Sequence, residues 1–329
     1  MSEPILITGA TGFLGRHLVS HLRSAPDCPT LRIFSYGPCP WAGQPGFEVI
    51  DGNIFDREQV TRAMEGCRQV YHLAGAVSRD PRDDWKMYDI HIGGTRNICE
   101  AAIVHRPEKI VAVSSSGTIA VSKQPEVLDE TAGYPLELIG EWAYYLSKVY
   151  AEKMTLDYIR RHELPITIAN PALLLGPGDE LGSSTGDVAN FLDGHVMALP
   201  LGGMCFVDAR DTAAGLVACM NKGRIGERYL LGGVNWTFKQ IIETVAEISG
   251  KRPPILQPSL GFSLGSARIL RRLMRLVGRE FKMDDVTIRM SSHYWYFSSA
   301  KAASELGFKT RGPMETLRDT VEDLLKRRS

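Results

Sequence analysis

Tyr144 and Lys148 are the pair of residues whose types and spacing point most directly to chemistry. They lie four positions apart in a stretch with a helical pattern, which puts both side chains on one face, one turn apart. A free tyrosine has a pKa of ~10 and holds its proton too tightly for exchange at neutral pH. A neighbouring ammonium is expected to lower that pKa and to make Tyr144 a proton donor and acceptor. Tyr145 also lies within a helical turn of the lysine and is the alternative.

A serine hydroxyl is expected to complete this catalytic group. Ser116 follows residues 109–115, which are predicted to form a strand. Its hydroxyl would orient a substrate carbonyl beside the tyrosine. Ser114 and Ser115 compete for this role, although strand hydroxyls can also be satisfied by the backbone. We therefore predict that Ser116 acts with the tyrosine and the lysine.

A glycine-rich segment follows the first predicted strand directly and opens a helix; it reads Gly9-Ala10-Thr11-Gly12-Phe13-Leu14-Gly15. In chain order, its three glycines would allow a tight turn, a close approach of the backbone to a pyrophosphate, and close packing of helix on strand. The phosphates would meet free N–H groups at the positive end of the helix. The predicted cofactor contacts here are Gly9, Thr11, Gly12, Phe13, Leu14 and Gly15.

The end of the second predicted strand is expected to choose between NAD and NADP. An acidic residue there holds the ribose hydroxyls of NAD, whereas an arginine favours the extra phosphate of NADP. This chain has Ser35 and Tyr36 at that point, and neither carries a charge. Arg16 and Arg32 are candidates for contact with a phosphate, although each could equally be a solvated surface residue. We therefore predict that NADP(H) is favoured over NAD(H).

Short apolar strands alternate with amphipathic helices through the first half of the chain. This alternation predicts an α/β fold, with a doubly wound parallel Rossmann sheet and a smaller C-terminal α/β substrate-binding domain. The predicted strands are 5–8, 31–35, 48–50, 69–73, 109–115 and 166–170. The predicted helices between them are 14–24, 57–65, 86–105 and 144–162.

The domain organisation follows from a change of rhythm after Pro171, where glycine-rich loops begin. Regular patterns return further along, at 211–221, 229–231 and 239–249. We assign residues 1–170 plus 205–233 to the dinucleotide-binding domain, and residues 171–204 plus 234–329 to the substrate-binding domain.

The bulk composition excludes several classes of protein. Of the 329 residues, 44% are hydrophobic, so a sizeable core is expected. Lys plus Arg and Asp plus Glu number 38 each, which leaves no global basic field to attract nucleic acid. The six cysteines are scattered, which argues against a disulfide framework or a zinc site and favours a reducing cytosol. We see no signal-peptide pattern and no membrane-spanning apolar run, and expect a cytoplasmic protein.

Together these motifs resemble the extended short-chain dehydrogenase/reductase family, of the NAD-dependent epimerase/dehydratase type, over nearly the whole chain. Within that family the chain looks most like bacterial proteins of the dihydroflavonol-4-reductase-like or hopanoid-associated sugar epimerase-like branch. The 3β-hydroxysteroid dehydrogenases are more distant relatives. The likeness is carried by the glycine-rich segment, the Tyr–Lys pair, and residues 51–54, 73–75, 114–116, 170–178 and 206–211.

The resemblance implies further cofactor contacts, mostly at the ends of the predicted strands. With the second-strand end, the implied set is Ser35, Tyr36, Asn53, Ile54, Leu73, Ala74, Gly75, Tyr144, Lys148, Asn170, Pro171 and Leu173. Two departures from the family matter: His91 replaces a structural Asn, and the end of the second strand is uncharged. Asn53 also stands where the family usually has an Asp. We expect His91 to be a packed histidine that the backbone satisfies.

The residues around the catalytic group favour a reductase among the reactions of this family. A sugar 4,6-dehydratase needs an acid/base pair beside the catalytic hydroxyl, where this chain has Gly117 and Thr118. A nucleotide-sugar epimerase must hold a diphosphate, usually with an arginine near the position of Met204. We therefore expect an apolar pocket. Its candidate lining residues, which could instead be core, are Phe191, Leu192, Val196 and Met197.

The expected reaction is reversible hydride transfer between NADP(H) and the carbonyl or alcohol carbon of a small hydrophobic substrate. Such an enzyme would be a ketone reductase, similar to dihydroflavonol reductases or hydroxysteroid dehydrogenases. The alternatives are a sugar epimerase and a non-catalytic NAD(P)-sensing protein. The sequence leaves open whether the protein forms a homodimer.

A basic amphipathic pattern at residues 267–277 has no role in this assignment. Its arginines recur at steps of four, three and four, and form one helical stripe of Arg268, Arg272, Arg275 and Arg279. The apolar residues of the segment include Ile269, Leu270, Leu273, Met274, Leu276 and Val277. Such a helix can lie on anionic lipid. The favoured alternative is an ordinary helix of the smaller domain, with its apolar face in the core and its arginines in water.

Overall fold

A parallel sheet of seven strands forms the larger domain of this computed structural model, which describes residues 3–276 and 285–328. In spatial order the strands are β3 (Phe47–Asp51), β2 (Leu31–Ser35), β1 (Ile5–Thr8), β4 (Gln69–His72), β5 (Lys109–Val113), β6 (Ile166–Pro171) and β9 (Arg228–Leu231). The strand order reverses between β1 and β4, so a ligand crevice is expected beyond their carboxyl ends. The predicted doubly wound Rossmann sheet is confirmed.

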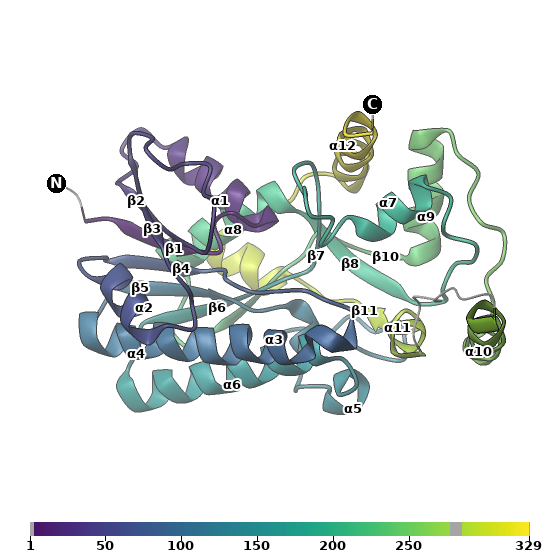
Figure 1. The fold of residues 1–329 in the computed structure, drawn as a ribbon, viewed down its shortest axis with the longest axis horizontal. Coiled ribbons are helices and arrows are strands. Elements are labelled where there is room, and N and C mark those ends of the chain that lie inside the picture. The colour runs from purple at the N-terminus through teal and green to yellow at the C-terminus, as the bar shows by residue number, and fades with distance from the viewer. Residues whose placement is uncertain (1–2, 277–284, 329) are drawn as a thin grey trace.

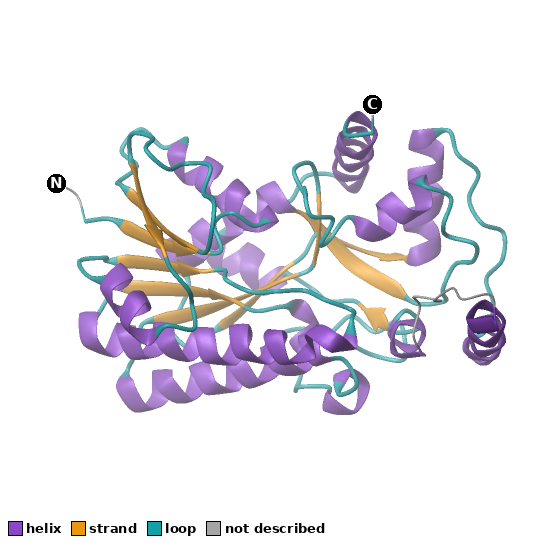
Figure 2. Ribbon diagram, in the orientation of Figure 1, coloured by secondary structure: helices purple, strands orange, loops and turns teal. Residues whose placement is uncertain are grey.

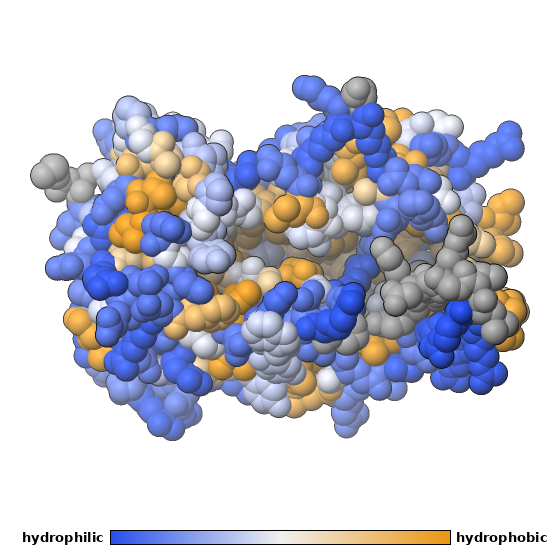
Figure 3. All heavy atoms as spheres, viewed as in Figure 1, coloured by the Kyte–Doolittle hydropathy of each residue, from blue (hydrophilic) through white to orange (hydrophobic). Residues whose placement is uncertain are grey.

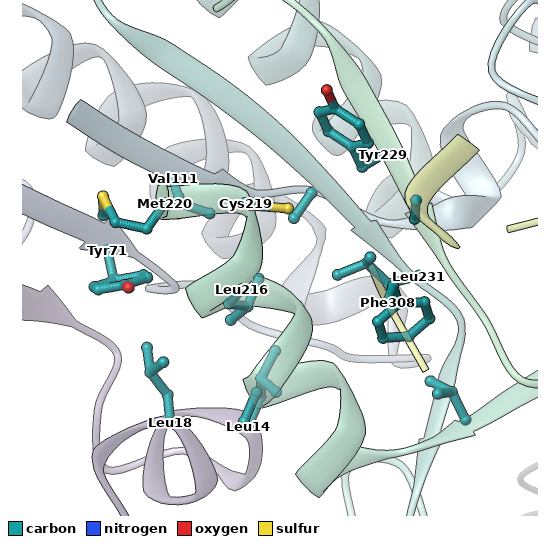
Figure 4. Close-up of a cluster of buried hydrophobic side chains, with 14 of the residues drawn as sticks. Leu14, Leu18, Tyr71, Val111, Leu216, Cys219, Met220, Tyr229, Leu231 and Phe308 are labelled. Atoms are coloured by element: carbon teal, nitrogen blue, oxygen red, sulfur yellow. The ribbon is translucent and has the colours of Figure 1, made fainter. Parts of the chain in front are cut away.

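Helices cover both faces of this sheet (Figures 1 and 2). One face carries α1 (Phe13–Arg23) and α8 (Ala209–Lys222), and the other carries α2 (Arg57–Met64), α4 (Thr95–His105) and α6 (Ala143–His162). Figure 4 shows Leu14 and Leu18 of α1 near Leu216 of α8, in the buried cluster that also contains Tyr71 of β4. The fixed position of α1 on the sheet places its N-terminus at the crevice.

A second, smaller domain is built on β7 (Leu173–Leu175), β8 (Gly203–Asp208), β10 (Val234–Thr237) and β11 (Tyr294–Trp295). Its helices are α7 (Gly186–Leu192), α9 (Phe238–Ser249), α10 (Leu260–Leu276), α11 (Asp285–Met290) and α12 (Pro313–Lys326). The segment 205–233 is divided between the domains, because β8 pairs with β7, β10 and β11 whereas β9 joins the large sheet. The domain division itself stays a prediction, with β8 placed in the smaller sheet.

One predicted helix, 86–105, is interrupted in the structure. It consists of α3 (Asp84–Tyr88), a π-helical turn at Asp89–Gly94, and α4. A Cβ on Gly94 would come within 2.8 Å of the Ile54 side chain, so the chain passes this point closely packed. The π-helical turn carries the buried His91 toward the larger domain's crevice, a placement that hydrophobic periodicity does not reveal.

The described residues contain no helix that is both long and apolar enough to cross a bilayer.

Candidate active site

Tyr144 and Ser115 are neighbours at the centre of the site. Tyr144 lies in the first turn of α6, and the interaction of its hydroxyl with the Ser115 side chain acts to lower its pKa. Ser115 lies just beyond β5, and its hydroxyl also accepts a hydrogen bond from the Gly117 backbone N–H at 3.3 Å. Ser116 lies one residue further, where it begins a short 3-10 turn, and it is also buried. The structure thus brings the tyrosine to Ser115, one residue before the predicted Ser116.

The aromatic neighbour Tyr145 has a different environment from Tyr144. Its ring is buried and packs against Trp142 and Trp295, each with a centroid separation of 4.7 Å. No hydrogen bond of its hydroxyl is found within the described chain. This packing makes Tyr145 part of a wall and leaves Tyr144 as the tyrosine that faces a serine hydroxyl.

Lys148 lies one turn beyond Tyr144 on α6, and its buried ammonium donates to the Val113 carbonyl at 3.0 Å. Burial lowers the pKa of Lys148 to about 8, and the Glu152 carboxylate opposes this change. The expected lowering of the tyrosine pKa is not found: burial raises the pKa of Tyr144, and only the interaction with the Ser115 side chain counteracts it. The Lys148 ammonium is not among the causes that change the pKa of Tyr144, so desolvation dominates.

Glu152 is a site residue that the sequence prediction missed. It lies one further turn along α6, is buried, and accepts hydrogen bonds from the ends of several elements. The donors are Ser114 Oγ at 2.7 Å, Thr118 Oγ1 at 3.1 Å, Asn170 Nδ2 at 3.1 Å, Tyr134 OH at 3.3 Å and Arg228 Nη1 at 3.4 Å. The spacing of four residues from Lys148 is a signal that could have found it.

His91 packs against Tyr144, with a separation of 5.7 Å between the two ring centroids. Its Nε2 accepts from the Ala76 backbone N–H at 3.2 Å, so Nδ1 carries the proton that is donated to Ser147 Oγ at 2.8 Å. Burial and the Lys148 ammonium lower the pKa of His91 to about 2, which keeps the ring neutral. This placement agrees with the predicted packed histidine.

The N-terminus of α1 is open to a phosphate. Its N-cap residue is Gly12, no side chain caps the helix, and no acidic residue lies in its first turn. A Cβ on Gly12 would meet only the Gly9 carbonyl oxygen, at 3.4 Å, whereas a Cβ on Gly15 would lie 2.2 Å from that oxygen. Gly9 adopts a φ of +72° against the backbone of Leu73 and Ala74. The turn therefore fits a pyrophosphate.

The other predicted cofactor contacts follow the carboxyl ends of the strands. Ala74 N donates to Thr8 Oγ1 at 3.3 Å. A Cβ on Gly75 would lie 3.4 Å from Lys148 Nζ, so the backbone at Gly75 is close to the ammonium. Asn53 accepts from Phe55 N in the turn after β3. The remaining members of the predicted set have these positions: Thr11, Phe13 and Leu14 in the glycine turn, Ile54 beside Gly94, Leu73 after β4, Pro171 at the end of β6, and Leu173 at the start of β7.

Asn170 has a structural role beneath the serine turn. It is fully buried, and its Nδ2 donates to the Ser115 carbonyl at 3.1 Å as well as to Glu152. Its Oδ1 is buried without a partner in the described protein. An unpartnered buried acceptor is costly, so this oxygen is a candidate contact for a bound group at the end of β6.

The end of β2 has neither an acid nor a free arginine. Ser35 is buried, and Tyr36 is 84% exposed. Arg32 is held at the opposite end of β2 by Glu48, at 2.8 Å. Arg16 binds the Thr11 carbonyl and Glu180. Both arginines that were candidates for a phosphate contact therefore already pair with carboxylates of the protein.

Comparison with known proteins identifies the family. A family model described as the NAD dependent epimerase/dehydratase family matches residues 5–232. The chain belongs to this family. It is 30% identical to a protein named "Putative dihydroflavonol 4-reductase" from Synechocystis sp., over 98% of this chain and 94% of the relative. It is 32% identical to sterol demethylase protein B of Methylococcus capsulatus, over 76% of each chain. The crystal structure of gox2253 has a TM-score of 0.86 and 28% identity, and covers 99% of both chains.

The predicted resemblance to extended short-chain dehydrogenases/reductases is thereby confirmed. One side of Tyr144 is bordered by apolar residues. One buried cluster contains Tyr145, Trp295 and Met290, and Met204 packs against it. Figure 3 shows the surface hollowed near the centre of the molecule, with hydrophobic atoms bordering the hollow.

The apolar pocket was predicted from the wrong residues. Phe191 and Leu192 are buried in the core of the smaller domain, where α7 packs near α9. Val196 packs against that core, and Met197 is largely exposed. For Phe191 and Leu192 the prediction failed because apolar side chains on a short helix serve a core as readily as a pocket.

Two glycine substitutions should separate cofactor binding from folding. Gly12→Ala is expected to fold normally but to weaken NAD(P) binding roughly 10- to 100-fold, because the new methyl group occupies the phosphate approach and disturbs charge-assisted hydrogen bonds. Gly15→Ala is expected to lower the free energy of unfolding by about 1–3 kcal/mol, because its methyl group meets backbone atoms. Calorimetric titration and urea denaturation of both variants measure these effects. Unchanged cofactor affinity in Gly12→Ala would contradict the assignment of the glycine turn as the phosphate-binding site.

Proposed function

We propose that this protein catalyses reversible hydride transfer between NAD(P)H and the carbonyl or alcohol carbon of a small hydrophobic substrate. The observation that carries the proposal is the placement of the Tyr144 hydroxyl beside the Ser115 side chain, with Lys148 one turn further along the helix. The apolar cluster around Tyr145 and Trp295 supports a hydrophobic substrate. The name of one relative, "Putative dihydroflavonol 4-reductase", is consistent with a reductase.

The residues around the pair have distinct roles in this mechanism. The glycine turn and the strand ends would hold the cofactor, and NAD(P)H, when bound, supplies the hydride for the carbonyl carbon. Ser115 donates a hydrogen bond to the carbonyl oxygen and so positions it beside the phenol. Tyr144 gives its proton to that oxygen as the carbonyl π bond opens, and in the oxidative direction it takes the proton back. The Lys148 ammonium stabilises the phenolate left behind.

The structure gives two physical reasons to favour this reaction over those of dehydratases and nucleotide-sugar epimerases. A Cβ on Gly117 would lie 2.1 Å from the Tyr145 ring, so an acid side chain has no space beside the serine turn. Met204 stands in register with Trp236 on one side and Trp295 on the other. An apolar residue between two tryptophans offers a diphosphate no charge partner.

Replacing the tyrosine tests the catalytic role. We expect Tyr144→Phe to lose about 10²–10⁴-fold in kcat for ketone reduction, because only the proton donor is removed, while NADP(H) binding is retained. Tyr145→Phe is the matched control and should keep most of the activity. Turnover with a panel of apolar ketones, followed by NADPH absorbance, gives the comparison. Loss of activity in Tyr145→Phe alone would reverse the assignment.

The two adjacent serines supply a second test. We propose Ser115 as the orienting hydroxyl in place of the predicted Ser116, because the Ser115 side chain is the one that influences the pKa of Tyr144. Ser115→Ala should lower kcat by about 10²–10³-fold, as expected for a lost oxyanion donor, and Ser116→Ala should remain active. A larger loss of kcat in Ser116→Ala than in Ser115→Ala would assign the role to Ser116.

A separate assay tests the reaction class. Conversion of UDP-glucose to UDP-galactose by the purified protein at enzymatic rates would identify an epimerase and contradict the proposed reductase.

We further propose that NADP(H) binds more tightly than NAD(H), by less than about tenfold. The missing acid at the end of β2 removes the usual preference for NAD, and no free arginine adds a strong charge pair with the extra phosphate. Asp51 Oδ1 accepts from Gly37 N at 3.1 Å, so a carboxylate lies beside this loop. Asp51→Asn should therefore raise the preference for NADP(H), as measured by calorimetric titration. Tighter binding of NAD(H) by the wild-type protein would contradict the proposal.

A further inference from the structure

We propose that the outward face of α10 is a docking surface for an anionic lipid membrane. The surface consists of an apolar ridge of Phe262, Ile269 and Leu273, and a flank of Arg268, Arg272 and Arg275. Figure 1 shows α10 at the periphery of the smaller domain, beyond α11. This inference is independent of the proposed hydride transfer.

The inward face of α10 carries the residues of the helix that are shielded from solvent. Ala267 is buried, and Leu264, Arg271 and Met274 are half-buried. At 100° per residue these positions lie within one narrow stripe of the helix. The other apolar residues considered below lie outside this shielded stripe.

The apolar ridge lies on the opposite side of the helix. Phe262, Ile269 and Leu273 are 69%, 63% and 55% exposed. Their steps of seven and four keep them on one line along the helix. Burying these three large side chains against lipid would remove from water an apolar surface that the described protein leaves uncovered.

The charges on α10 all have one sign. No acidic residue occurs among its seventeen residues. Arg268 pairs with Asp285 of α11, whereas Arg272 and Arg275 have no ion-pair partner in the described part of the chain. The helical positions of the arginines place them beside the ridge, where an interfacial helix presents cations to lipid headgroups.

The favoured alternative from the sequence, an apolar face in the core with arginines in water, is therefore only half right. The helix has two apolar faces, and one of them is exposed. Val277 and Arg279, which belong to the predicted pattern, lie outside the described residues.

Charge complementarity favours lipid over a second copy of the chain. A two-fold dimer through this surface would bring two copies of the same cationic patch together. Their like charges oppose association, whereas an anionic headgroup layer attracts Arg272 and Arg275, which pair with no acid in the described part of the chain. The exposed residues Ile255 and Leu256 and the charged Lys251 and Arg252 precede the helix in sequence and have the same mixed character.

The surface is connected to the wall of the active site. Asp285 of α11 accepts from Arg268 and Arg271 of α10. At its other end, α11 contributes Met290 to the cluster that contains Tyr145 and Trp295. A membrane bound at α10 would thus be held by the same domain that walls the catalytic tyrosine.

Co-sedimentation of the full chain with vesicles tests the proposal. We expect binding to vesicles of phosphatidylglycerol mixed with phosphatidylcholine, little binding to phosphatidylcholine alone, and release at high salt as the arginines are screened. Arg272→Gln with Arg275→Gln should lower the partition coefficient on the order of 30-fold. Ile269→Ser with Leu273→Ser should abolish binding.

Matched controls keep the result specific. Val104→Ser with Ile225→Ser removes two similarly exposed apolar residues elsewhere, and Arg62→Gln with Arg318→Gln removes two exposed cations from other helices. Both controls should bind like the wild-type protein, and ketone reduction in free solution should be unchanged in all four variants.

Three outcomes would overturn the proposal. The first is failure of the wild-type protein to sediment with anionic vesicles. The second is binding by the two α10 double variants that equals wild-type binding. The third is a wild-type dimer in solution that binds no vesicles and that Ile269→Ser with Leu273→Ser converts to a monomer. The last outcome would assign the ridge to a second copy. Because activity in free solution is measured separately, failure of docking is distinguishable from failure of the proposed reaction.

Discussion

The buried carboxylate of Glu152 is the interaction on which the geometry of the site depends. An ionised carboxylate in a protein interior is unfavourable unless its oxygens are satisfied by hydrogen-bond donors. Here the donors come from the end of β5, the turn after it, β6 and β9, and all converge on one face of α6. The same face carries Tyr144 and Lys148. The carboxylate thereby fixes the distance between that helix face and the serine turn, where the hydroxyl of Ser115 must meet the phenol.

Much of the fold could be predicted from the sequence because buried parallel strands have short apolar runs bounded by turn residues. The strands at 5–8 and 31–35 have the predicted bounds. Features set by tertiary contacts could not be predicted in this way. The π-helical turn at Asp89–Gly94 lies against Ile54, and β8 pairs with β10 and β11, which are later in the chain.

The same division applies to the site. The Tyr–Lys spacing is a helical signal, and the glycine turn is a local one, so both could be predicted. Three consecutive serines offer no local criterion for choosing Ser115, because the choice is made by which hydroxyl faces α6. Trp295 reaches the site from the other end of the chain, so the apolar wall could not be located by local patterns. Burial raises the pKa of Tyr144, opposite to the expected direction. The spacing of Tyr144 and Lys148 does not reveal how far solvent reaches the phenol.

Transfer of deuterium to an apolar ketone from NADPH that carries deuterium at both C4 positions of the nicotinamide tests the proposed hydride transfer most directly. Mass spectrometry of the alcohol product should find one deuterium on the carbinol carbon with the wild-type protein. The Tyr144→Phe variant should bind the labelled cofactor but form the product at a strongly reduced rate. Absence of deuterium from that carbon in a product that the wild-type protein does form would contradict hydride transfer at this site.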